Sequence, residues 1–137
     1  PALMAFDTPS REKCVLKRQR TNTPMQALIT LNDEQFVEAS RVFAERILKS
    51  DRTDFKDRLD YAFELATSRP SDDLRRNVLK STYDEQHALF TKEPERAKQL
   101  LAVGDSKPGA SIDPVEHATW TLLASMILNL DETLNRE

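Results

Sequence analysis

Residues 18–33 read Arg-Gln-Arg-Thr-Asn-Thr-Pro-Met-Gln-Ala-Leu-Ile-Thr-Leu-Asn-Asp. Thr23 and Gln26 form a capping box, in which the Thr23 hydroxyl accepts from the Gln26 N–H and the Gln26 side chain reaches back to the Thr23 N–H. Pro24 then takes the first helical position, where its missing N–H is harmless. The stretch therefore predicts a short helix from Pro24 to about Leu31.

Asn32 gives a second start signal directly after this apolar run, with Gln35 three residues later. We expect a longer helix from about Asp33 to Lys49. Its apolar side chains recur at helical spacing and cover one wide face. They are Phe36, Val37, Phe43, Ala44, Ile47 and Leu48, with Ser40 among them.

Three further helices are predicted downstream from the same kinds of signal. Each begins at a capping residue or a proline and ends close to a residue that disfavours helix. Their ranges are about Asp54 to Ser68, from the Ser71-Asp72-Asp73 cap to about Thr91, and from Pro94 to a C-cap at Gly104.

Asp113 and Pro114 begin the last predicted helix, as N-cap and first helical residue. A helix that is apolar nearly all round, as this one is, is buried on several sides. Two interpretations stay open: the helix is the centre of this bundle, or its second face docks on another part of a parent protein. The candidate interaction face consists of Trp120, Leu123 and Ile127.

The chain has 137 residues, enough for one helical domain that spans 1–137. Only two glycines and a charged fraction of 31% favour helices over a turn-rich β fold. We therefore predict an all-α bundle of five or six mostly antiparallel helices with short connections. Residues 1–10 are expected to form an extended lead-in.

Several functional classes find no support in the sequence. Cys14 is the only cysteine, so no internal disulfide and no Cys-x-x-Cys metal or heme-attachment motif can form within this chain. Nucleophile motifs and phosphate-cradling glycine loops are absent. His87 and His117 each have a carboxylate nearby on the same helix, but two ligands do not make a metal site. The apolar stretch 120–130 is shorter than the ~20 residues that a membrane span needs.

Basic residues gather just before the first predicted helix. Residues 1–31 hold five basic and two acidic side chains, whereas 32–137 hold fifteen and twenty-one. Because helix N-termini favour anions, one hypothesis is a site for a carboxylate, sulfate or phosphate. The alternative is that the arginines pair with acids such as Glu34 or Glu38. The candidate anion-binding residues are Arg18, Arg20, Thr21 and Asn22.

Nucleic acid is not an expected partner of this basic segment. The formal net charge of the whole chain is −3, and no aromatic residues are interleaved with the basic ones to stack on bases.

Three groups of residues carry a resemblance to a known family. They are Phe6-Asp7-x-Pro9, then Arg18-x-Arg20-Thr21-Asn22-Thr23-Pro24-x-Gln26-Ala27-Leu28-x-x-Leu31-Asn32-Asp33, and the ending from Leu128-Asn129-Leu130-Asp131-Glu132 to Arg136-Glu137. The chain resembles the uncharacterised domain at the C-terminal end of large planctomycete proteins, which often carry a cytochrome-c-like heme domain near the N-terminus. It departs from that family at Thr133-Leu134, where many relatives are expected to have an aromatic residue.

The resemblance implies an exported, extracytoplasmic parent protein and a helical fold. It also implies that any heme lies outside this chain and that only the C-terminal half of the family domain is present. We predict a non-catalytic structural and interaction module that packs on the remainder of the parent chain, with a homodimer possible for the isolated chain. The alternative is an anion-binding part of an extracytoplasmic enzyme that acts on a sulfated polysaccharide.

Overall fold

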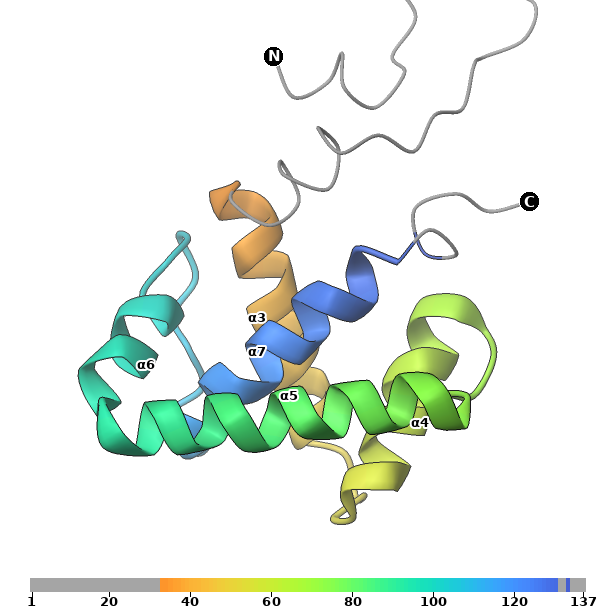
Figure 1. Cartoon of the computed structure of the whole chain (residues 1–137). Coiled ribbons are helices and arrows are strands. Elements are labelled where there is room, and N and C mark those ends of the chain that lie inside the picture. Colours follow the sequence, from red (N-terminus) through yellow and green to blue (C-terminus); the bar gives the residue numbers. More distant parts are fainter. Residues whose placement is uncertain (1–32, 131–132, 134–137) are drawn as a thin grey trace, which may run out of the picture.

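The computed structural model describes residues 33–130 and residue 133. Within them five α-helices follow one another and no strand occurs (Figure 1). The all-α fold class is therefore confirmed, whereas the antiparallel order of the helices stays a prediction. The predicted helix at 24–31 and the lead-in at 1–10 lie outside the described residues.

All five helices begin within about two residues of the predicted starts, and the four helices with a predicted end finish within about two residues of it. Four of them start at an aspartate whose side chain accepts a backbone N–H two or three residues ahead, as N-caps do. The helices are α3 (Glu34–Leu48), α4 (Phe55–Thr67), α5 (Asp73–Lys92), α6 (Pro94–Leu101) and α7 (Pro114–Leu128).

The cap of α7 is confirmed, and the cap of α3 is shifted by one residue. Asp113 accepts from the Glu116 N–H at 3.0 Å. At α3 the capping residue is Asp33 and not Asn32, because the Asp33 carboxylate accepts from the Gln35 N–H at 2.9 Å. Asn and Asp cap about equally well, so two adjacent candidates cannot be ranked from local sequence.

The predicted C-cap of α6 at Gly104 is wrong. The helix ends at Leu101 with Ala102 as its C-cap, and the backbone N–H of Ala102 bonds to the Lys98 carbonyl at 3.0 Å. Gly104 lies two residues further on, with a φ of 94°. The glycine thus serves the turn after the helix rather than the helix end.

α7 is the central helix of the described residues. It contacts α3, α4, α5 and α6, and it crosses the middle of Figure 1 in blue. Trp120, Leu123 and Ile127 are each at most 1% exposed. The predicted interaction face on these three residues is therefore wrong, because neighbouring helices of the same chain cover it. A homodimer of this chain would have to use another surface.

Two apolar clusters fill the space around α7. The first joins α3, α4 and α5 to α7, and the second joins α5 and α6 to it. α6 has only eight residues, too few for a stable isolated helix, so it depends on the second cluster. The second cluster consists of Phe90, Ala97, Leu101 and Ala118.

None of the described helices has the length and apolar character required to cross a membrane.

The connection between α6 and α7 is fastened to α3 by a carboxylate. Glu38 accepts from the Ser106 N–H at 2.8 Å, from the Asp105 N–H at 3.2 Å and from the Ser106 hydroxyl. These bonds hold the pKa of Glu38 below its ordinary value, and the bond from the Ser106 hydroxyl has the largest effect. A Cβ on Gly104 would lie 2.7 Å from the Glu38 Cβ, so the close approach requires glycine.

Candidate functional site

Glu116 gathers polar side chains from three helices at one point. Its Oε1 accepts from Trp120 Nε1 at 3.0 Å and lies 3.4 Å from Arg58 Nη1, and its Oε2 accepts from the Tyr83 hydroxyl at 2.6 Å. The Nε2 atom of His87 lies 3.7 Å from the same Oε2. We call these five residues the Glu116 cluster. They come from α4, α5 and α7.

Aromatic rings form one wall of the Glu116 cluster. The Phe55 ring centroid lies 5.1 Å from that of Tyr83 and 5.6 Å from that of Trp120. His87 stacks on Tyr83 at 5.5 Å, because residues four apart share one face of α5. The side chain of His87 is 41% exposed and forms the edge of the cluster toward solvent.

The electrostatics of the Glu116 cluster favour fixed hydrogen bonds over proton transfer. Burial, together with the bond to Glu116, raises the pKa of Tyr83 above its ordinary value of 10. The phenol therefore stays protonated at neutral pH and acts as a donor. Both carboxylate oxygens of Glu116 already accept from donors of this chain. The arrangement connects α4 and α5 to α7.

Neither histidine pairs with the acid that precedes it on its own helix. The carboxylate of Asp84 bonds to Lys80 Nζ at 2.5 Å, whereas His87 lies beside Glu116. His117 is 1% exposed, and its Nε2 is 3.2 Å from the Arg41 carbonyl oxygen. Within residues 33–130 and residue 133, no group of three His, Cys, Asp or Glu is placed to hold a metal ion.

His117 makes the stability of the fold sensitive to pH. Burial lowers the pKa of its imidazole below the ordinary value of 6.5, against an opposing effect of the Arg41 carbonyl and Glu45. The folded chain thus binds fewer protons here than the unfolded chain, and the free energy of unfolding falls as the pH drops below about 6.5. We expect urea denaturation to show a lower midpoint at about pH 5.5 than at about pH 7.5.

The matched variant for this pH dependence is His117→Gln, which keeps a donor but cannot titrate. Its unfolding midpoint should change less between the two pH values than that of the unchanged chain. An equal change in both proteins would show that His117 is not the group responsible.

Two features of the structure were not predicted from the sequence, the bond between Glu116 and Trp120 and the burial of Arg41. Glu116 and Trp120 are four residues apart on α7, a spacing that allows their hydrogen bond and could have indicated it. Arg41 is 1% exposed, with Nη2 bonded to the Ser106 carbonyl at 2.8 Å. Its position between Ser40 and Ala44, on the buried face of α3, is the signal that could have found it.

The predicted anion site lies outside the described residues. This holds for its four members, Arg18, Arg20, Thr21 and Asn22. It also holds for Thr23 and Gln26, the capping residues of the predicted helix at 24–31. Glu38, one of the two acids named as a partner for these arginines, is engaged by Ser106 and lies 3.6 Å from Arg41. The anion hypothesis stays a prediction.

A family model matches the N-terminal part of the chain. It is described as PSD1, Protein of unknown function (DUF1553), and covers residues 1–83. No curated protein and no solved structure matches the chain. The matched residues include α3, α4 and the first half of α5, with Arg58 and Tyr83 of the Glu116 cluster. Glu116 itself lies beyond them.

Proposed function

This chain belongs to the PSD1 family of proteins of unknown function, and we propose that it acts as a non-catalytic structural and interaction module of a larger protein. One support is the Glu116 cluster, whose carboxylate bonds to Tyr83 of α5 and lies near Arg58 of α4. Such a carboxylate stabilises the arrangement of the helices. The other support is an apolar surface that the described residues leave open.

Leu74 and Val78 form that surface, and they carry the proposal. They lie one turn apart on α5, where their side chains are 75% and 52% exposed. A single exposed apolar residue is ordinary on a protein surface. Two at a spacing of four form a continuous strip that another helix can cover. We call them the α5 stripe and assign it to contact with the remainder of the parent chain.

The proposal extends to the context of the parent protein. The run at 18–33 resembles the C-terminal domain of planctomycete proteins that carry a cytochrome-c-like domain, and this resemblance supports an exported, extracytoplasmic parent. Any heme would then be held by that other domain. The module would supply contacts rather than cofactor ligands.

The test replaces the apolar side chains of the α5 stripe with carboxylates. We expect Leu74→Glu/Val78→Glu to weaken binding to the remainder of the parent chain, made as a separate polypeptide, by about tenfold in titration calorimetry. Thermal unfolding of the variant should match that of the unchanged chain, since both side chains are mostly exposed.

The matched control is Asn77→Glu/Ser81→Glu. Both positions are exposed on the same helix, at the same spacing, and the exchange adds the same charge. Its affinity should stay within about twofold of the unchanged chain. If the two double variants bind equally well, the α5 stripe is not the contact and the proposal fails.

The alternative function, anion binding, rests on the five basic residues between Arg11 and Arg20. It predicts that the chain binds a sulfated polysaccharide such as heparin and that Arg18→Ser/Arg20→Ser abolishes this binding. If the variant binds as the unchanged chain does, or neither binds, the alternative is rejected.

A further inference from the structure

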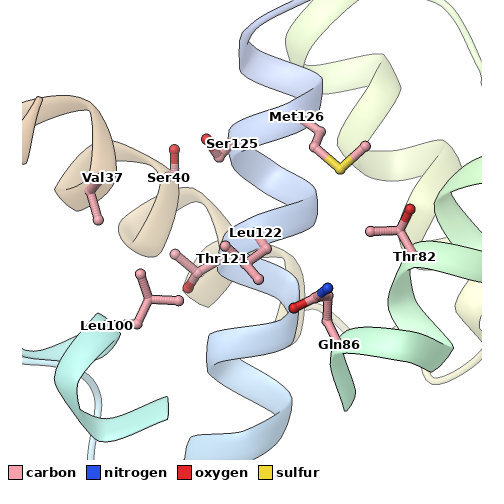
Figure 2. Close-up of a pocket in the computed structure, with 9 residues that line it drawn as sticks. All are labelled: Val37, Ser40, Thr82, Gln86, Leu100, Thr121, Leu122, Ser125 and Met126. Atoms are coloured by element: carbon pink, nitrogen blue, oxygen red, sulfur yellow. The ribbon is translucent and has the colours of Figure 1, made fainter. Parts of the chain in front are cut away.

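A groove of about 280 Å³ opens between α3, α5, α6 and α7. Figure 2 shows side chains from all four helices around it. Val37 of α3, Leu100 of α6, and Leu122 and Met126 of α7 supply its aliphatic lining. The groove therefore has apolar walls from helices that are far apart in the sequence.

Three hydroxyl groups in the groove are already engaged by their own helices. Ser40 Oγ donates to the Phe36 carbonyl at 2.8 Å, and Thr121 Oγ1 donates to the His117 carbonyl at 2.8 Å. Thr82 Oγ1 bonds in the same way, to the carbonyl four residues back, at 3.0 Å. With these donors satisfied, the lining suits aliphatic side chains better than a polar ligand.

The chain directly ahead of α3 has the composition and the reach to fill the groove. Residues 24–31 are predicted to be helical, with Met25, Leu28 and Ile29 on one face at spacings of three and four. Only Asn32 and Asp33 separate this segment from α3, and so short a connection favours an antiparallel neighbour.

The length of the segment matches the position of the groove. A helix of eight residues is about 12 Å long. If it runs antiparallel to α3 from the start of that helix, it lies alongside the first two turns of α3. Val37 and Ser40, the residues that α3 contributes to the groove, lie within those two turns.

A second surface on α3, around Ala39, Val42 and Phe43, is also within reach. It is formed by α3 alone and includes the polar residues Gln35 and Arg46. A helix placed there would contact one neighbour, whereas a helix in the groove would contact several. Since apolar burial stabilises in proportion to the area covered, the groove is favoured.

We propose that residues 24–31 dock in the groove, with Met25, Leu28 and Ile29 against its aliphatic lining. The proposal concerns the chain itself and does not depend on the α5 stripe.

Thiol labelling of the full chain tests this docking. In a Cys14→Ser background, the Ser125→Cys variant places one thiol in the groove with little change in side-chain size. We expect this thiol to react with a maleimide about tenfold more slowly than it does when Leu28→Asp/Ile29→Asp is added, because the aspartates expel the segment. The control is Val42→Cys, on the other surface of α3, which should react equally fast in both backgrounds and so reports that the bundle stays folded.

Three results would overturn the proposal. The Ser125→Cys thiol could react equally fast with and without the aspartates, which means that the segment does not cover the groove. The Val42→Cys thiol could be the one that reacts faster when the aspartates are added, which places the segment on the other surface of α3. The protection of the Ser125→Cys thiol could depend on protein concentration, which makes a second copy of the chain the occupant.

Discussion

We expect Trp120→Ala to lower the free energy of unfolding by about 4 kcal/mol, as for other buried large aromatic side chains. Trp120 is 1% exposed on α7, and its ring contacts Phe55 of α4 and Tyr83 of α5. Removing it leaves a cavity where three helices meet and removes the donor to Glu116. Urea unfolding followed by circular dichroism measures the change.

Leu74→Ala is the control for Trp120→Ala. It also truncates a large apolar side chain, but one that is 75% exposed, so the change should stay within about 0.5 kcal/mol. If Trp120→Ala costs no more than Leu74→Ala, Trp120 does not belong to the core and the description of α7 as the central helix is wrong.

Glu116→Ala is expected to lower the free energy of unfolding by about 3 kcal/mol, because hydrogen bonds to a charged group are the stronger ones and their donors lose the acceptor. Trp120 Nε1 and the Tyr83 hydroxyl bond to this carboxylate, and Arg58 lies 3.4 Å from it. The loss of stability is limited because the Glu116 side chain is 23% exposed, so water can bond to part of what the carboxylate leaves. Chemical denaturation at neutral pH gives the value.

The control for Glu116→Ala is Glu95→Ala on α6. The Glu95 side chain is 75% exposed and contacts only Lys98 among the ion pairs of the described residues. Its removal should change stability by less than about 0.5 kcal/mol. A loss of similar size in both variants would mean that the Glu116 cluster does not stabilise the fold.

Local chemistry made the helix boundaries predictable. Asp113-Pro114 marked the start of α7 correctly, because both signals are local: the aspartate accepts a backbone N–H of the first turn, and proline has a fixed φ that suits the first helical position. Gly104 misled for the same reason: the preference of glycine for positive φ indicates a turn but not which turn. Signals of this kind fix an element to within a residue or two and no better.

The arrangement of the helices was less accessible from sequence. The apolar residues of α7 showed that it is covered on more than one side, but periodicity does not say by what. Trp120 was therefore compatible with both a core and an interface. The structure decides for the core, because α4 and α5 place Phe55 and Tyr83 against it.

The Glu116 cluster could be predicted only in part. The bond between Glu116 and Trp120 spans four residues on one helix, whereas Tyr83 and Arg58 are 33 and 58 positions away from Glu116. Contacts over such separations follow from the packing of α4 and α5 on α7. No local pattern carries that information.

The most direct test of Glu116 as a structural brace is a double-mutant cycle with Tyr83. We expect Tyr83→Phe to lower the free energy of unfolding when Glu116 is present and to have almost no effect in the Glu116→Ala background, with a coupling energy of about 1–2 kcal/mol. The bond between the Tyr83 hydroxyl and Glu116 Oε2, 2.6 Å long, joins α5 to α7 and is the interaction that the cycle isolates. Additive effects of the two substitutions would contradict the account, and Glu116 would then need a role other than holding these helices together.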